Sequence, residues 1–266
     1  MNKLSAFVDG IGLIGPGING WPDGRAVLRG DVAYLTKKTQ YPQPMLLPPT
    51  ERRRTSPVVK LALAVGLEAI EMAGMMPARL PTVFASSGGD TINCHLLCET
   101  LASSDRHISP TRFHNSVTNA PSGYWSIATG SMAPSTVLCG YDASFGAGLL
   151  DALTQIAVDN MTCALIAYDI DYPEPLHSTR PVPDGFGVAL VLSPRRSNRS
   201  LARIAAELTY DAPSQLADPA LEQLRGTIPA ARNLPLLRNL AHGDAGTVVI
   251  DYLAPLCIKI EVSPCS

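Results

Sequence analysis

Two short and almost entirely apolar segments limit the folds open to this chain more than any other feature. They are "CALIAYDI", residues 163–170, and "FGVALVLS", residues 186–193. Strands of this kind are buried on both faces of a sheet, which then needs helices above and below it. Apolar helices predicted at residues 56–74 and 143–161 can provide that cover. The sequence therefore predicts an α/β fold in which a sheet lies between helices.

Shorter segments continue this alternation along the chain. The predicted elements are strands at 5–12, within 81–90, at 135–140, 246–253 and 257–262, helices at 91–103, 116–130 and 214–241, and a strand or short helix at 201–210. Residues 16–55 are rich in proline and glycine, which predicts a long ordered loop there. No flexible linker interrupts the chain, so we expect a single domain over residues 1–266.

The helix at 56–74 carries its own start and stop signals. Ser56 is a good N-cap residue, and Pro57 suits the first helical position, where its missing N–H is not needed. Gly74 suits the left-handed conformation that ends many helices. This helix is therefore the element with the best-defined ends in the sequence.

Composition excludes several classes of function. The chain is 46% hydrophobic and 17% charged, which allows a large core, and its net charge of -2 argues against a nucleic-acid partner. It shows neither a signal peptide nor a membrane span, so we expect a soluble cytoplasmic protein with no membrane partner. Cys94 and Cys98, with His95 between them, lack a fourth metal ligand, so we predict no metal site.

A glycine pattern near the N-terminus suggests a dinucleotide site. Gly10, Gly12 and Gly15 have the spacing G-x-G-x-x-G after a predicted strand. That motif binds a pyrophosphate only if a helix follows directly. The next residues are "PGINGWPDG", whose prolines and glycines disfavour a helix. We therefore expect a tight turn and no bound cofactor.

A second short motif surrounds Ser144. "DASFGAG", residues 142–148, resembles the G-x-S-x-G nucleophile elbow, with Asp142 in place of the first glycine. A serine hydrolase also needs a histidine and an acid, and none of the five histidines lies in a telling motif. Ser144 remains a candidate nucleophile for an alternative function.

Four longer stretches together resemble the β-ketoacyl synthases. "FVDGIGLIGPG" is similar to the first strand and turn of that family, and residues 51–74 to its helix ending in E-A-L-x-D-A-G. Residues 109–153 resemble the segment leading into its active-site elbow, and residues 180–193 resemble a strand pair beginning R-P-F-D.

Order and spacing of these matches hold from residue 6 to about residue 210, so the chain is similar to the N-terminal half of a ketosynthase domain. The resemblance implies a thiolase-like layered fold, with helices covering a mixed sheet. Residues 1–210 would form the ketosynthase-like half, and residues 211–266 a strongly reduced C-terminal part.

Departures from the family pattern bear on activity. An active ketosynthase has a cysteine at the start of the helix predicted near residue 143, where the helix dipole lowers the pKa of the thiol. Counting forward from Pro134 places Asp142 there, counting back from residues 163–170 places Ala143 there, and Asp142 suits a helix N-cap. Cys139 lies earlier, within the predicted strand, where its side chain would pack. The family's H-G-T-x-T and N-x-x-x-G-H motifs are absent, so the resemblance implies no catalytic residues and no acyl condensation by this chain alone.

An inactive relative of this kind resembles the chain-length factor of type II polyketide and aryl-polyene clusters, and its reduced C-terminal part most resembles the short aryl-polyene type. Such a subunit forms a heterodimer with an active ketosynthase, alone or within a higher assembly, and meets acyl carrier protein only indirectly. Implied interface and tunnel residues are Phe113, His114, Asn115, Asn119, Tyr124, Trp125, Thr136, Val137, Leu138, Cys139 and Tyr141. Phe113, Tyr124 and Trp125 could equally be core aromatics.

Two other functions stay open. One is a stand-alone acyltransferase or thioesterase that uses Cys139 or Ser144 as its nucleophile. The other is an inactive homodimeric scaffold.

Overall fold

A computed structural model describes residues 3–265, and in that part of the chain nine strands form one mixed sheet. Its order is β4-β3-β5-β6-β1-β7-β9-β8, and β2 pairs with β1 outside this path. The strands are β1 (Leu4–Gly15), β2 (Ile18–Asn19), β3 (Thr82–Ala85), β4 (Ser135–Leu138), β5 (Cys163–Asp169), β6 (Phe186–Ser193), β7 (Ala202–Thr209), β8 (Gly246–Asp251) and β9 (Cys257–Pro264).

The predicted α/β architecture with helices on both faces of a mixed sheet is confirmed. Every residue of β5 and β6 is buried, as their apolar sequences require. β4, β3 and β5 run parallel, whereas all other pairs are antiparallel. The segment at 201–210 is a strand, and β9 pairs with it, so the C-terminal hairpin β8–β9 extends the same sheet.

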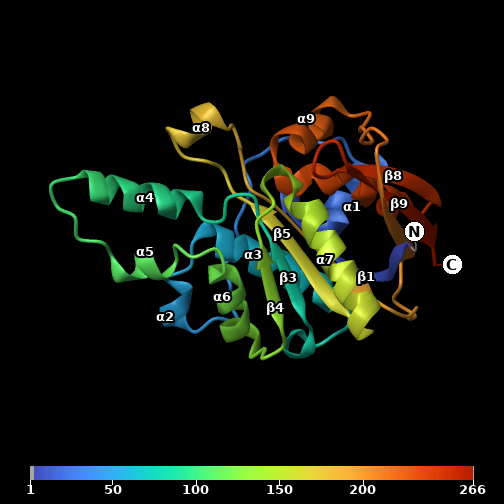
Figure 1. The fold of residues 1–266 in the computed structure, drawn as a ribbon, viewed down its shortest axis with the longest axis horizontal. Coiled ribbons are helices and arrows are strands. Elements are labelled where there is room, and N and C mark those ends of the chain that lie inside the picture. Colours follow the sequence, from blue (N-terminus) through green and yellow to red (C-terminus); the bar gives the residue numbers. More distant parts are fainter. Residues whose placement is uncertain (1–2, 266) are drawn as a thin grey trace.

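Two apolar layers enclose this sheet. One contains α3 (Pro57–Ala73) and α6 (Ala120–Thr129), and the other contains α7 (Ser144–Asp159), α1 (Trp21–Arg29) and α10 (Leu234–His242). Figure 1 shows α7 lying across the sheet, with α4 (Thr91–Ala102) and α5 (Pro110–His114) extending away from it as an arm. The remaining helical segments are α2 (Pro49–Arg52), η1 (Pro77–Arg79), η2 (Tyr141–Ala143), α8 (Leu176–Thr179), α9 (Pro219–Thr227) and η3 (Pro229–Asn233).

The predicted ends of α3 are confirmed, whereas the loop predicted at 16–55 is wrong in three places, where β2, α1 and α2 form. Helix α1 forms there, although its sequence contains Pro22 and Gly24. Pro22 lies in the first turn, where a backbone N–H has no helical partner, and Gly24 is buried against Leu13 and Ile18. The carboxylate of Glu68 accepts the N–H of Trp21 at 2.6 Å, which supplies the N-terminal cap that α1 itself lacks.

The opening glycines also have a different role from the predicted turn. Gly10 and Gly12 lie inside β1, where α3 crosses the strand at close range. A Cβ atom on Gly12 would lie 2.0 Å from the carbonyl oxygen of Val65, and one on Gly10 equally close to that of Ala69. The glycines therefore permit contact between strand and helix backbones.

The helical segment predicted at 214–241 is divided in three. Pro229 and Pro235 lack the N–H of a continuing helix, and the chain forms α9, η3 and α10 in succession. Within residues 3–265, no helix is both long enough and apolar enough to span a bilayer.

Candidate functional site

The turn between β4 and α7 is the place where the sequence predicts the family's nucleophile. It begins after Leu138 and ends at Ser144, at the edge of the sheet where the parallel strands β3, β4 and β5 have their carboxyl ends. Tyr141 has a φ of 53°, in the left-handed region that residues with a Cβ rarely adopt. Strained backbone of this kind often marks functional sites.

Asp142 does not cap α7, contrary to the prediction. The cap position is Ala143, which makes no side-chain cap bond. The carboxylate of Asp142 instead accepts from Arg180 at 2.6 Å and from Arg232 at 2.9 Å. Two fixed cations outweigh the weaker attraction of backbone N–H groups, so the aspartate turns toward them.

These contacts belong to a longer row of alternating charges. Arg232 lies 3.7 Å from Asp251, and Asp251 accepts from Arg225 at 2.6 Å. Arg225 also pairs with Glu222. The row joins the turn before α7 to η3, α9 and β8, and thereby ties residues 211–266 to the nucleophile turn.

Neither candidate nucleophile of the alternative function is activated. Cys139 lies just beyond β4 and is exposed, which corrects its predicted position inside the strand, and desolvation with the nearby Asp169 raises the pKa of its thiol. A raised pKa disfavours the reactive thiolate. Ser144 is buried, its hydroxyl donates to the carbonyl of Tyr141 at 2.7 Å, and it accepts the N–H of Gly140 at 3.0 Å.

No histidine supports Ser144 or Cys139 among the hydrogen bonds of residues 3–265. His95 pairs with Glu99 at 3.2 Å, and His107 pairs with Asp105. The described residues contain no group of three metal-ligating side chains. Ser144 therefore serves to shape the turn.

A buried carboxylate lies next to this turn, at the end of β5. Asp169 accepts from the N–H and the hydroxyl of Ser87 at 2.8 and 2.7 Å, and from the N–H of Ala230 at 2.8 Å. Complete burial is the largest influence on this group and raises the pKa of Asp169 to about 6, although its hydrogen bonds act in the opposite direction. Sequence reasoning missed this residue, because only the fold brings β3, β5 and η3 together.

Asp169→Asn is expected to change how stability depends on pH. The pKa of the carboxyl is about 6 in the folded chain against an ordinary 3.8, so the folded state binds the proton more tightly. The resulting stabilisation is complete below about pH 4 and is lost as the pH rises through about 6, a difference of about 3 kcal/mol. Urea unfolding from about pH 3 to about pH 7 should show the wild type losing that amount relative to Asp169→Asn.

Asp211→Asn provides a control of opposite sign. The hydrogen bond from Lys259 lowers the pKa of the Asp211 carboxyl, so its contribution is lost only as the pH falls below its ordinary value of 3.8. Parallel pH profiles of the wild type and Asp169→Asn would contradict the assignment.

An open cleft of about 870 Å³ adjoins Tyr141. Its walls come from the start of α4, from α8 and from the turn itself, and include Tyr172, Leu176 and Thr91. The guanidinium of Arg180 lies 3.6 Å from the centre of the Tyr141 ring and donates to the hydroxyl of Tyr172 at 3.0 Å. The cleft is mainly apolar, with the cation of Arg180 at its edge, and the single carboxylate of Asp142 is shared between Arg180 and Arg232.

The predicted interface residues fall into three groups. Phe113, His114, Asn119 and Tyr124 line one groove of about 510 Å³ on α5 and α6, together with Val117 and Ile127. Thr136, Val137 and Leu138 form the edge strand β4, with Cys139 and Tyr141 directly after it.

The other interface candidates are internal. Trp125 belongs to the core and packs edge-on against Phe84. Asn115 is buried, donates to the carbonyl of Arg54 and accepts from the Tyr124 hydroxyl. Tyr124 is almost fully buried although it borders the groove, whereas Phe113 is 68% exposed.

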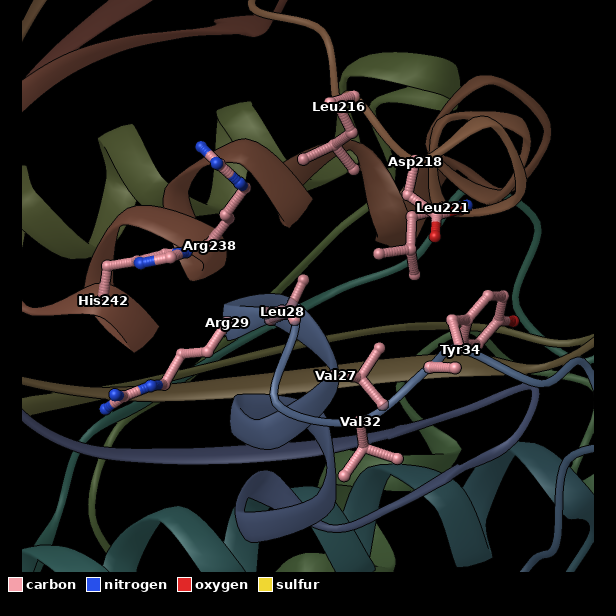
Figure 2. Close-up of a pocket in the computed structure, with 13 residues that line it drawn as sticks. Val27, Leu28, Arg29, Val32, Tyr34, Leu216, Asp218, Leu221, Arg238 and His242 are labelled. Atoms are coloured by element: carbon pink, nitrogen blue, oxygen red, sulfur yellow. Dashed lines mark hydrogen bonds between the residues drawn. The ribbon is translucent and has the colours of Figure 1, made fainter.

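A third pocket, of about 250 Å³, lies between α1 and α10 (Figure 2). Its apolar wall includes Val27, Leu28 and Leu221, and Figure 2 shows Arg29, Arg238 and His242 gathered at one end. Arg29 is paired with Asp31 at 3.1 Å. No sequence signal indicated this pocket, because its two walls are far apart in the chain.

Comparisons with solved structures show the same fold along the whole chain. One chain of "Ketosynthase (ApeO) in Complex with its Chain Length Factor (ApeC) from Xenorhabdus doucetiae" matches with a TM-score of 0.73 and 20% identity, over 97% of this chain and 100% of that one. A chain of the ishigamide ketosynthase/chain length factor matches with a TM-score of 0.74 and 13% identity, over 98% and 100%.

A chain of AntDE:AntF, a type II PKS acyl-carrier protein in complex with its ketosynthase, matches with a TM-score of 0.75 and 12% identity, over the full length of both. No curated protein has significant sequence similarity to this chain.

The family model described as "Beta-ketoacyl synthase, N-terminal domain" matches residues 29–247 of this chain. That match covers most of the chain and includes the turn before α7. The chain belongs to the family of β-ketoacyl synthase N-terminal domains.

Proposed function

We propose that this chain is a non-catalytic subunit of the chain-length-factor type, which pairs with an active β-ketoacyl-ACP synthase and helps to shape its acyl tunnel. The observation that carries the proposal is the fold, which matches chains of ketosynthase and chain-length-factor complexes over their full length. The turn before α7 supports the proposal. Its residues are Tyr141, Asp142 and Ala143, and none of them is the cysteine that an active ketosynthase uses as its nucleophile.

The biosynthetic setting is part of the proposal. Polyketide, aryl-polyene or fatty-acid-type synthesis in the cytoplasm fits a subunit of this size and family, with acyl carrier protein reached through the active partner. Residues 1–210 would provide the ketosynthase-like half, and residues 211–266 the reduced remainder.

Two surface features could bind a partner subunit: the open edge of strand β4 and the groove on α5 and α6. Among residues 3–265, β4 pairs only with β3, and Leu138 directs its carbonyl to the N–H of Ser86. Backbone groups alternate along a strand, so those of Val137 point to the open side and can pair with another chain. The groove on α5 and α6 adds exposed apolar surface from Phe113 and Ile127.

Co-expression with a matching active ketosynthase from the same organism tests this function. We expect a 1:1 complex by size-exclusion chromatography with light scattering, and condensing activity only when both chains are present. A monodisperse monomer that ignores the ketosynthase would refute the proposal, and a stable homodimer alone would indicate the scaffold function.

Intact mass spectrometry tests the acyltransferase alternative in the same material. After incubation of the chain with acyl-CoA or acyl carrier protein, we expect no acyl adduct, because Ser144 is buried and the thiol of Cys139 has a raised pKa. An adduct that disappears in Cys139→Ala or Ser144→Ala would establish that alternative instead.

A further inference from the structure

We propose that Tyr141, rather than Asp142 or Ala143, occupies the nucleophile position of this chain, in surroundings that would still activate a thiol. This inference deepens the proposed non-catalytic function, on which it rests. It attributes the inability to form a thioester to one side chain, that of Tyr141. The cleft and the charged groups next to Tyr141 are still present.

Backbone geometry distinguishes the three residues. A nucleophile elbow presents its side chain from a strained turn between a strand and a helix, where the next residues begin the helix. Tyr141 alone among the three has a positive φ, and it lies between β4 and the first turn of α7.

The directions of the side chains agree with this assignment. Ala143 is buried, and Asp142 points to Arg180 and Arg232. Tyr141 is 61% exposed and lines the cleft of about 870 Å³. Of the three residues, only Tyr141 lines the cleft.

Local charge favours an anion at residue 141. Arg180 lies over the Tyr141 ring at 3.6 Å and is itself held by Asp142 and Tyr172. The start of the 16-residue helix α7 adds the partial positive charge of its free N–H groups. Both influences stabilise a thiolate, and tyrosine, being a poor nucleophile at neutral pH, leaves them unused.

Cysteine scanning of the turn tests the assignment. Tyr141→Cys, Asp142→Cys and Ala143→Cys are treated separately with iodoacetamide near neutral pH, and alkylation is followed peptide by peptide. The thiolate sulfur forms a bond to the methylene carbon and iodide leaves with the bonding electrons, after the thiol proton has gone to solvent. Native Cys98 and Cys139, both exposed, serve as references within each sample.

We expect the new thiol of Tyr141→Cys to react about ten-fold faster than Cys98 or Cys139, equivalent to a thiol pKa lowered by about one unit. Asp142→Cys should react no faster than these references, and Ala143→Cys should react slowly because its side chain is buried. Adding Arg180→Ala to Tyr141→Cys should remove most of the acceleration.

Two outcomes would overturn the proposal: faster reaction of Asp142→Cys than of Tyr141→Cys, or reaction of Tyr141→Cys at the rate of Cys139. Thermal unfolding of each variant shows whether it is folded, and the exposed position of Tyr141 makes its replacement well tolerated. The assay uses the single chain, so its failure is distinguishable from a failure to bind the ketosynthase.

Discussion

Gly12→Ala is expected to lower the free energy of unfolding by about 3 kcal/mol or more, or to prevent folding. The added methyl would lie 2.0 Å from the carbonyl oxygen of Val65 and 2.8 Å from its carbonyl carbon. Both are backbone atoms of α3, so no side-chain rotation can make room. The helix would have to move off β1, and the apolar layer around Val65 and Ala69 would open.

Gly226→Ala is the matched control for this substitution. Gly226 lies in α9, and a Cβ there would meet nothing within 4 Å. Because alanine has the higher helix propensity, this variant should be as stable as the wild type, or more stable by up to about 1 kcal/mol. Urea unfolding followed by circular dichroism measures both, and equal midpoints for the two variants would show that close packing of α3 on β1 is unimportant.

Ile127→Arg is expected to weaken binding to the ketosynthase by at least about 100-fold, equivalent to about 3 kcal/mol. Ile127 is 51% exposed and lies beside Phe113 in the groove on α5 and α6. A buried interface at this place would have to accept an unpaired guanidinium, which costs far more than the lost apolar contact. Titration calorimetry with the purified partner measures the change.

Val158→Arg is the control for binding. Val158 is 75% exposed on α7 and lies outside that groove, so the same chemical change should leave the affinity unaltered. Both variants should unfold at the temperature of the wild type, because each side chain is exposed. Equal affinities for the two variants would place the ketosynthase on another face.

Local sequence was sufficient to predict two kinds of element: strands that are apolar on both faces, and a helix whose ends are set by neighbouring residues. The apolar runs of β5 and β6 required burial on both faces, and they lie in the middle of the sheet. Pro57 at the first helical position and Gly74 in the left-handed conformation bound α3 as predicted, and Ser56 occupies the extended N-cap position although its side chain makes no cap hydrogen bond.

Prediction failed where distant residues decide a conformation. Helix α1 contains Pro22 and Gly24, yet it forms because Glu68 caps its first turn and Leu13 packs on Gly24. Asp142 has the local preference of an N-cap, but two arginines that follow it far along the chain bind it more strongly.

The segment "VDGIGLIGPG" illustrates both what the sequence predicts and what it leaves to the tertiary structure. Composition and order of motifs by themselves determined an α/β fold and a ketosynthase-like chain, because patterning and family motifs are written along the sequence. Only the tertiary structure decided that Gly10 and Gly12 admit the α3 backbone, and that Tyr141 faces the cleft while Asp142 joins a row of charges. Those contacts depend on segments that meet only after folding, and their energies exceed the local preferences that a sequence displays.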